Sequence, residues 1–437
     1  MENKFKVSQV FKLVLPTTFM MSFMSLYTIV DGAFVSRFVG TDALSAVNIA
    51  YPYVNFLLGV SIMLGTGGCA LVMKKIGEKR NNEAKKDFSL IVYFTFILSI
   101  LIMFLSLVFI EQILKILQAE GSLYKATKEY LFYMIVFATP TMLKYIVEQF
   151  LVAINKSKTA LILSVSGGIL NIILDYVFIV LFKFGVKGAA IATGIGYAVP
   201  AIIGLWFFIK KSNLLHFKMP SKNISVILSS CSNGSSEMVS QLSSGIITFL
   251  FNFVMLKYIG EDGVAAITII LYIQYLVTSI FLGYSIGVSP KISYFYGSKD
   301  IPMLKSLISI SIKLVLAISI FSYIIITISS PLLIRFFTEP NTNVYSLTLE
   351  GLKIYSLSFL IVGMLIFVSG MFTSFSNGKV SAIISFLRAL VFESTGIILF
   401  PMLIGISGVW WSVPIASLLC GFVCFYFYKK YKPIYNY

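Results

Sequence analysis

Long apolar runs separated by short polar breaks recur from one end of the sequence to the other. A helix needs about 20 mostly apolar residues to cross a hydrocarbon core of about 30 Å, and many of the runs reach that length. The pattern therefore predicts an all-α polytopic membrane protein with twelve transmembrane helices. The expected spans are residues 13–36, 46–72, 88–110, 129–154, 160–182, 188–209, 226–256, 264–290, 306–330, 349–374, 380–404 and 407–428.

The sequence also repeats at an offset of 220 residues, since FVSRFVGTDALSAVNI around Gly40 returns as FVMLKYIGEDGVAAIT around Gly260. Each half holds an even number of crossings, so the halves enter the membrane with the same orientation. We therefore expect two pseudo-symmetric six-helix bundles, related as parallel repeats, around a central cleft. The N-terminal bundle is residues 1–209, the cytoplasmic linker 210–225 and the C-terminal bundle 226–437. The same offset relates Gly77 to Gly297, Gly185 to Gly405 and Gly188 to Gly408.

Composition agrees with a membrane protein, because 58% of the residues are hydrophobic and only 12% are charged. The net charge of +16 is spread over alternating loops rather than gathered in one patch, so we expect no nucleic-acid partner. Lys and Arg accumulate in the loops that include residues 74–86 and 210–222. Because such residues concentrate in short cytoplasmic loops, both termini should be cytoplasmic.

The amino-terminal segment MENKFKVSQVFK is basic and leads into an apolar stretch from Leu13 to Val30. A signal peptide would have a short apolar core followed by a small-residue cleavage pattern, whereas this stretch is long and has no such pattern. We therefore expect it to be a retained first helix.

Motifs for covalent or nucleotide chemistry are missing from the sequence. It has no GxxxxGK[ST] loop, no HExxH, and a single histidine, His216. We expect neither an enzyme nor a cofactor, and an ion gradient, of H⁺ or Na⁺, as the energy source. The cysteines lack disulfide or ligand spacing and are interpreted as small buried side chains: Cys69, Cys231, Cys420 and Cys424.

Charged residues inside apolar spans are costly, and they mark functional positions by default. None should face lipid. These residues are Asp31, Lys144, Glu148, Asp175, Glu237, Lys313, Arg388 and Glu393.

Two of these acids are the predicted ion-coupling groups, each with a polar neighbour one helical turn earlier. Asp31 follows Tyr27, and Asp175 follows Asn171. Carboxylate, amide and hydroxyl oxygens suit a proton or Na⁺, so Asp31, Asp175 and Asn171 form a possible Na⁺ site. The alternative for Asp31, which we place close to the end of the first helix, is an ordinary interfacial aspartate.

Glu237 lies in NGSSEMVSQLSSG, a small and polar helix face that also carries Gln241. A buried carboxylate there could exchange a proton for a cation, so Glu237 is assigned to both ion coupling and substrate binding. A protonated, hydrogen-bonding structural role is the alternative. The residues assigned to substrate contact are Glu148, Glu237, Gln241, Gln274 and Glu393.

The other charges have structural interpretations. Lys144 and Glu148 are spaced for an ion pair along one helix face. Arg388 and Glu393 lie roughly 140° apart on an α-helix, so we expect each to find a partner on another helix. Lys313 is expected to reach the interface. The acids do not follow the 220 offset, because Glu237 corresponds to Thr17, Asp31 to Phe251 and Asp175 to Thr395, which favours one ion site.

The segments LYTIVDGAFVSRFVGTDALSAVNIAYP, GTGGCALVMKKIGEKRNNEAKK and NIILDYVFI followed by GVKGAAIAT resemble the multidrug and toxic compound extrusion (MATE) family, in its DinF/MepA-like bacterial branch. The resemblance covers essentially the whole chain. It implies a twelve-helix, two-lobed exporter of lipophilic cations in exchange for H⁺ or Na⁺, with Asp31, Asp175 and Glu237 at family acidic positions. The usual motif after the fourth helix reads VAINKSK here, and Gly32 follows Asp31, so the coupling ion stays open.

Three functions remain in competition. The first is an antiporter that works by alternating access, as a monomer among membrane lipids, with lipophilic cations as its substrates. A flippase for lipid-linked or polysaccharide precursors would need a basic cavity, whereas the intramembrane charges are five acids and three bases. A scaffold or sensor would have polar faces that never meet. A major-facilitator transporter is disfavoured because its usual loop signature between the second and third helices is missing.

Overall fold

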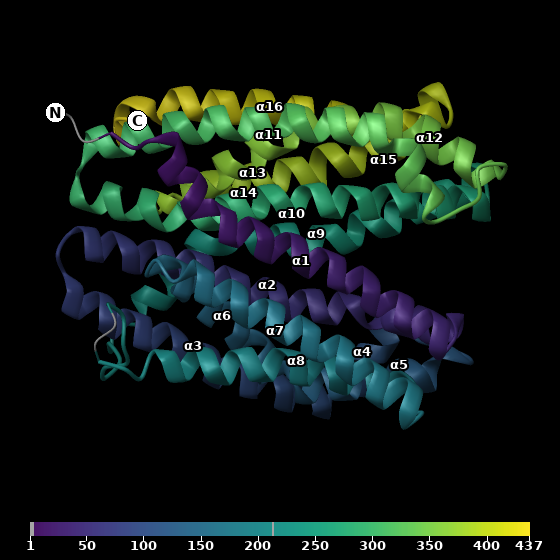
Figure 1. Ribbon diagram of the computed structural model, residues 1–437, viewed down its shortest axis with the longest axis horizontal. Helices are drawn as coiled ribbons and strands as arrows, with labels where there is room; N and C mark the ends of the chain where they lie inside the picture. The colour runs from purple at the N-terminus through teal and green to yellow at the C-terminus, as the bar shows by residue number, and fades with distance from the viewer. Residues whose placement is uncertain (1–3, 212–213) are drawn as a thin grey trace.

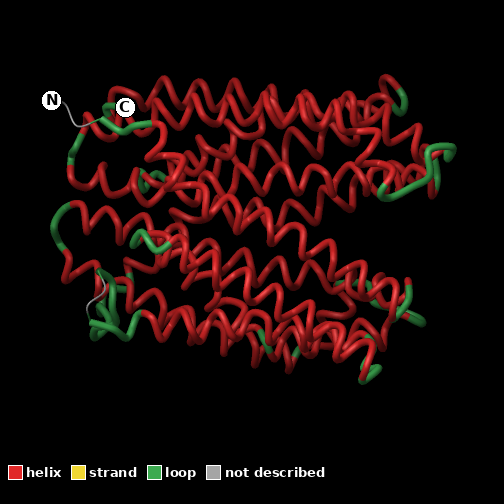
Figure 2. Tube along the Cα trace, viewed as in Figure 1, coloured by secondary structure: helices red, strands yellow, loops and turns green. Residues whose placement is uncertain are grey.

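Helices account for every regular element of the computed structural model, which describes residues 4–211 and 214–437 (Figures 1 and 2). Residues 1–3, at the start of the predicted N-terminal bundle, and 212–213, in the predicted linker, lie outside the described residues. The described ranges contain no strand.

The described part of the first half contains eight α-helices and one π-helical segment. They are α1 (Val7–Phe38), α2 (Thr41–Gly77), α3 (Asn81–Val108), α4 (Ile110–Ile116), α5 (Leu123–Val136), α6 (Ala138–Ala153), α7 (Ser157–Asp175), the π-helix η1 (Tyr176–Leu181) and α8 (Val186–Phe207).

The second half contains eight more α-helices and two short segments of other helix types. They are α9 (Ser225–Tyr258), α10 (Glu261–Ser298), α11 (Ile301–Arg335), α12 (Asn343–Tyr355), the 3₁₀ turn η2 (Ser356–Ser358), α13 (Phe359–Ser374), α14 (Gly378–Phe386), the π-helix η3 (Leu387–Glu393), α15 (Ser394–Ile404) and α16 (Ser407–Tyr435).

The predicted membrane spans are confirmed. By length and composition, 11 helices of the described chain can cross a membrane, and α5 with α6, bent by 53°, makes up to 12. The helices are longer than the predicted spans because polar residues continue them beyond the apolar layer. For example, α2 has 37 residues, or about 56 Å at 1.5 Å per residue. The short helix α4 was not predicted.

The 220-residue repeat is visible in the positions of the helices. Helix α2 starts at Thr41 and α10 at Glu261, while α3 starts at Asn81 and α11 at Ile301. The glycine before each of α2 and α10 has a positive φ, 120° at Gly40 and 95° at Gly260. Glycine adopts this conformation without the penalty of a Cβ, so the repeated glycines preserve the same chain reversal in both halves.

Two bundles lie side by side, and both termini are at the same end (Figure 1). Helices α1 and α2 of the first half pack along α10 and α9 of the second. Each bundle has its own apolar core, but the beginnings of α1 and α9 cross over. Val10 and Val14 belong to the core of the C-terminal bundle, and Val226 and Ile227 to the core of the N-terminal one. The bundles therefore interlock at the end where the chain begins.

Glycines allow the helices to approach closely at this interlocked end. A Cβ on Gly67 of α2 would lie 2.0 Å from the carbonyl oxygen of Ser230 on α9, and a Cβ on Gly234 of α9 would lie 2.0 Å from that of Met63. Asn233 of α9 reinforces the contact, since its Nδ2 donates to the carbonyl oxygen of Gly67 on α2 at 3.4 Å. No larger side chain fits at these positions without moving a backbone.

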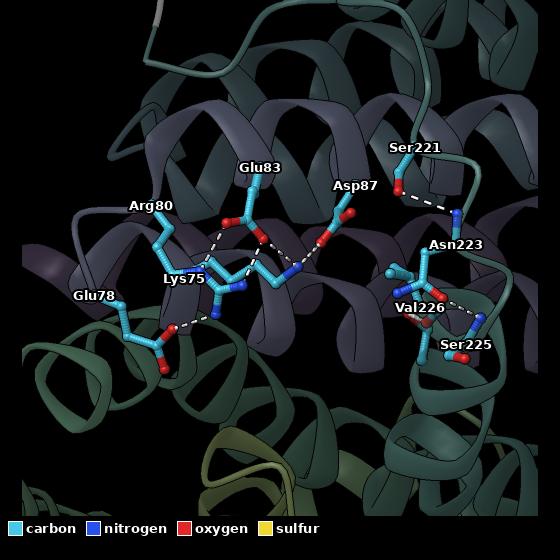
Figure 3. Close-up of polar contacts among 10 residues, drawn as sticks. Lys75, Glu78, Arg80, Glu83, Asp87, Ser221, Asn223, Ser225 and Val226 are labelled. Atoms are coloured by element: carbon cyan, nitrogen blue, oxygen red, sulfur yellow. Dashed lines mark hydrogen bonds and ion pairs between the residues drawn. The ribbon is translucent and has the colours of Figure 1, made fainter.

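A network of ion pairs holds the corner between α2 and α3 at the same end (Figure 3). Lys75 pairs with Asp87 and lies 3.5 Å from Glu83. Arg80 bonds both oxygens of Glu83 and, at 3.1 Å, Glu78. Asp87 is only 3% exposed, so its pairing with Lys75 compensates a buried charge.

Candidate functional site

The N-terminal bundle brings Asp31, Asn171 and Asp175 together between α1, α7 and α8. Helices α7 and α8 pack closely because a Cβ on Gly167 would lie 2.5 Å from the carbonyl oxygen of Gly196. This approach places Asn171 next to Thr193, to whose Oγ1 it donates at 3.3 Å. Asp31 lies about two turns before the end of α1, which continues to Phe38. Asp31 thus lies inside the first helix, as the predicted span of residues 13–36 implies.

Four oxygen atoms at this site are buried acceptors without a hydrogen-bond partner among the described residues. They are Oδ1 of Asp31, Oδ1 of Asn171 and both carboxyl oxygens of Asp175, a residue with no exposed surface. The Asp31 and Asp175 carboxyl groups interact electrostatically with each other. Two buried carboxylates repel one another, so this arrangement favours a proton or a bound cation between them. We call Asp31, Asn171, Asp175 and Thr193 the N-bundle acidic site.

A polar and aromatic layer adjoins the N-bundle acidic site. The Tyr27 hydroxyl donates to the Tyr197 hydroxyl at 3.0 Å. Lys144 is 2% exposed, and its Nζ lies 5.3 Å from the centre of the Tyr197 ring and 4.4 Å from that of Tyr145. These cation–π contacts help to compensate the burial of the ammonium group.

Glu148 completes the compensation of Lys144. Its Oε1 lies 3.1 Å from Lys144 Nζ, and the Ser164 hydroxyl donates to the same oxygen. The predicted ion pair on one face of α6 is therefore present. Glu148 is 5% exposed. Its two partners, Lys144 and Ser164, line the same narrow gap as Asn171, so Glu148 adjoins the N-bundle acidic site.

The C-terminal bundle holds a second group of charges, on α9 and η3. Arg388 interacts electrostatically with both Glu237 and Glu393. Our expectation that Arg388 and Glu393 lie about 140° apart is wrong, because Leu387–Glu393 is π-helical. Since a π-helix pairs residues five apart, it brings these two positions toward the same side. Glu393 is 9% exposed, and Glu237 is partly buried.

The remaining predicted contacts lie near the boundary between the bundles or deeper in the second one. The Tyr355 hydroxyl donates to Oε1 of Gln274 at 2.6 Å, and Tyr355 also lies near Glu393. Gln241 packs against α2, where a Cβ on Gly59 would lie 3.5 Å from the Gln241 Cβ. The predicted site residues thus form two groups, one in each bundle, rather than one cluster.

Several polar residues of these groups were not predicted. Thr193 and Tyr197 are four apart on α8, and this spacing in an otherwise apolar span is the signal that could have revealed them. Tyr275 of α10 has its hydroxyl beside Ser25 and Thr28 of α1, a contact between bundles that no local pattern indicates. Of the cysteines, Cys69, Cys420 and Cys424 are buried as expected, and all four are free.

Comparison with known proteins gives a consistent result. The family model MatE matches residues 16–177 and 237–395. Multidrug export protein MepA of Staphylococcus saprophyticus is 27% identical over 427 residues, which are 95% of this chain and 93% of that protein. The protein of the same name from Staphylococcus aureus is 27% identical over 425 residues, with the same shares.

Solved structures share the fold. A multidrug resistance MATE family transporter in an outward-facing conformation has a TM-score of 0.91 at 24% identity, covering 98% of this chain and 96% of that chain. A transporter from Pyrococcus furiosus, described as having a binding pocket of reverse polarity, has a TM-score of 0.90 at 23% identity, covering 100% and 98%. The two-bundle architecture is therefore that of known MATE structures.

Proposed function

The chain belongs to the MatE family, and from this membership we propose that it exports lipophilic cations in exchange for H⁺ or Na⁺ by alternating access. Its length matches that of the multidrug export proteins it resembles. The observation that carries the exchange mechanism is the set of four unpartnered buried acceptors in the N-bundle acidic site.

The N-bundle acidic site is the proposed coupling site. A proton shared by Asp31 and Asp175 would remove their repulsion, and a Na⁺ ion would use the same carboxylates with the oxygens of Asn171 and Thr193. Tyr27, by its hydrogen bond to Tyr197, would hold the polar and aromatic layer in place beside the ion. The unpartnered polar atoms of the site, among the described residues, are all acceptors, which suits a cation rather than an anion.

The proposed substrate contacts are Glu148, Glu237, Gln241, Gln274 and Glu393, with Glu237 also linked to ion coupling. Glu237 is supported by its partial burial on α9, a helix that packs against α2 of the other bundle. Glu148 has aromatic neighbours, because its partner Lys144 lies against the rings of Tyr145 and Tyr197. A flat lipophilic cation gains from a carboxylate and aromatic faces together.

Alternating access is supported by the close contact between the bundles at one end. Gly67 and Gly234 bring α2 against α9 at the end that carries both termini and the basic loops. We infer that this end is cytoplasmic and that it is closed in the present state. Export then requires the glycine contacts to separate so that substrate can enter from the cytoplasm.

A flippase for pyrophosphate-linked precursors is not favoured, because the basic side chains within the two groups of charges already have carboxyl groups beside them. Lys144 pairs with Glu148, and Arg388 interacts with two carboxyl groups. We place the protein in a bacterial plasma membrane as a monomer surrounded by lipid. Neither covalent catalysis nor nucleic-acid binding is part of the proposed function.

Proteoliposomes that contain the full chain provide the test. Ethidium efflux would be measured with a proton gradient or a Na⁺ gradient imposed separately. Efflux driven by one gradient would establish the exchange and identify the ion. Folded protein that moves neither ethidium nor other lipophilic cations under either gradient would refute the proposal.

A further inference from the structure

A cavity of about 230 Å³ opens on the outer side of the N-terminal bundle, away from both groups of acids. Tyr93 and Phe96 of α3, which are 55% and 42% exposed, form its membrane side. Leu143 of α6 and Leu205 of α8 form its floor, and Phe217 and Lys218 of the segment between α8 and α9 form its wall. The interior is thus apolar, and one edge carries a basic residue.

The wall of this cavity is held in place by specific contacts. The Phe217 ring stacks on Phe88, with centroids 5.3 Å apart, and its backbone N–H donates to the carbonyl oxygen of Phe208 at 3.1 Å. The Lys218 backbone N–H donates to Ser89 Oγ at 2.9 Å. The cavity is therefore a feature of the folded chain, because its wall is tied to both α3 and α8.

Positive charge surrounds the edge of the cavity. The Lys218 ammonium lies 2.8 Å from Oδ1 of Asn82, at the beginning of α3, and Lys86 and Lys222 are exposed nearby along the chain. The acids of this region, Glu83 and Asp87, are already paired with Arg80 and Lys75. The edge is therefore complementary to an anion.

The depth of the cavity matches one leaflet of a bilayer. Ser89 and Phe96 lie 8 and 15 residues after Asn81, the first residue of α3, which is about 12 and 22 Å along the helix axis. The basic edge is then near the membrane surface, and the apolar interior is within the hydrocarbon layer.

We propose that this cavity binds one anionic phospholipid from the leaflet at the basic end, with part of an acyl chain between Tyr93, Leu143 and Leu205 and the phosphate at Lys218. Basic pockets between transmembrane helices recognise lipid head groups in this way. The bound lipid would add to the contacts that hold Phe217 and Lys218 on the N-terminal bundle. The proposal is independent of transport.

Native mass spectrometry of the full chain provides the test. The protein is released from nanodiscs that contain equal amounts of phosphatidylglycerol and phosphatidylcholine with the same acyl chains. We expect one phosphatidylglycerol to be retained preferentially. Lys218→Gln should reduce that preference about fivefold, since one basic residue near the surface contributes about 1 kcal/mol to anionic lipid binding. Leu205→Trp, which fills the cavity, should reduce retention of both lipids.

Matched controls separate the cavity from general lipid contact. Ile203→Trp is on the same helix but outside the cavity lining, and Lys429→Gln removes an exposed lysine at the same end in the other bundle. Neither should change retention. Equal retention of the two lipids by the wild type, or loss in the controls as large as in the test variants, would overturn the proposal. Because Lys218 is exposed, Lys218→Gln remains informative even if Leu205→Trp fails to fold.

Discussion

Gly77 of α2 and Gly297 of α10, which are related by the 220-residue repeat, lie against each other across the two bundles. A Cβ on Gly77 would be 3.1 Å from the carbonyl carbon of Gly297, and a Cβ on Gly297 would be 2.1 Å from the carbonyl oxygen of Lys74. Equivalent residues of two repeats meet only close to the axis that relates them. The contact therefore marks the pseudo-twofold axis at the basic end of the molecule.

This contact predicts the effect of a single added methyl group. In Gly77→Ala the new Cβ would lie 2.2 Å from the carbonyl oxygen of Tyr294, so backbone has to move. We expect a loss of about 1–3 kcal/mol from the free energy of unfolding, as for other overpacked positions. The midpoint of thermal unfolding in detergent measures it.

Gly245→Ala is the matched control, because nothing lies within 4 Å of its added Cβ. It should keep or raise the midpoint, since alanine favours helix by about 1 kcal/mol over glycine. Equal midpoints for the two variants would contradict the close packing at Gly77.

The ion pairs of Figure 3 predict a second difference in stability. Lys75→Ala leaves the Asp87 carboxyl group buried without its partner, and we expect a loss of about 2 kcal/mol, because Lys75 itself is partly exposed. Arg80→Ala removes only solvent-exposed ion pairs, which contribute little, so it should destabilise the protein less than Lys75→Ala does. Thermal unfolding of both variants tests this order, and a larger loss for Arg80→Ala would refute it.

Much of the fold could be predicted from the sequence because a bilayer imposes a length and a polarity on every span. The repeat could be found because glycines are required at fixed turns, such as Gly40 and Gly260, and at close contacts, such as Gly77 and Gly297. The bend between α5 and α6 could have been predicted, because Pro140 has no N–H to donate to the carbonyl oxygen of Val136, the last residue of α5. The π-helix η3 could not, because no residue type in LRALVFE distinguishes a π-helical turn from an α-helical one.

The candidate sites were only partly predictable for a related reason. The free-energy cost of burying a charge identifies Asp31, Asp175, Glu237 and Glu393 individually, but it does not indicate which of these acids lie close together. Asp31 and Asp175 are far apart in the sequence, and their proximity depends on how α1 packs against α7. The period of an α-helix also gave the wrong relation between Arg388 and Glu393, because the backbone there is π-helical.

For the N-bundle acidic site we expect Asp31→Asn and Asp175→Asn each to reduce gradient-driven ethidium efflux about tenfold or more. That factor is a typical size for the coupling between two ligands, here the ion and the substrate. The folded protein should be retained, because each change removes one of two repelling carboxylates. Efflux from proteoliposomes and size-exclusion profiles measure the two effects. Asp42→Asn, an exposed position in the first turn of α2, is the control and should transport normally. Wild-type efflux by both site variants would remove this site from the mechanism.

The same site predicts ion-dependent stability. Whichever ion is coupled, H⁺ or Na⁺, should stabilise the wild type by about 2.7 kcal/mol at a concentration of 100 times its dissociation constant. Asn171→Ala removes a ligand oxygen of the N-bundle acidic site and should reduce that stabilisation. Thermal unfolding measured against pH and against Na⁺ at constant ionic strength distinguishes the two ions. Stabilisation by neither ion would contradict a cation site between Asp31 and Asp175.

Glu237 predicts a defect in substrate affinity that differs from the coupling defect. In Glu237→Gln the charge-assisted contact with a cationic substrate is lost, and such contacts contribute about 1.5–3 kcal/mol, or at least about tenfold in affinity. We therefore expect a higher KM for ethidium, while the ion-dependent stabilisation of the N-bundle acidic site is kept. Glu339→Gln, which changes an acid outside the helices of both groups, should leave both quantities unchanged. If Glu237→Gln exports ethidium with the wild-type KM, then Glu237 is a structural, hydrogen-bonding residue, and the substrate charge must be recognised by Glu148 or Glu393 instead.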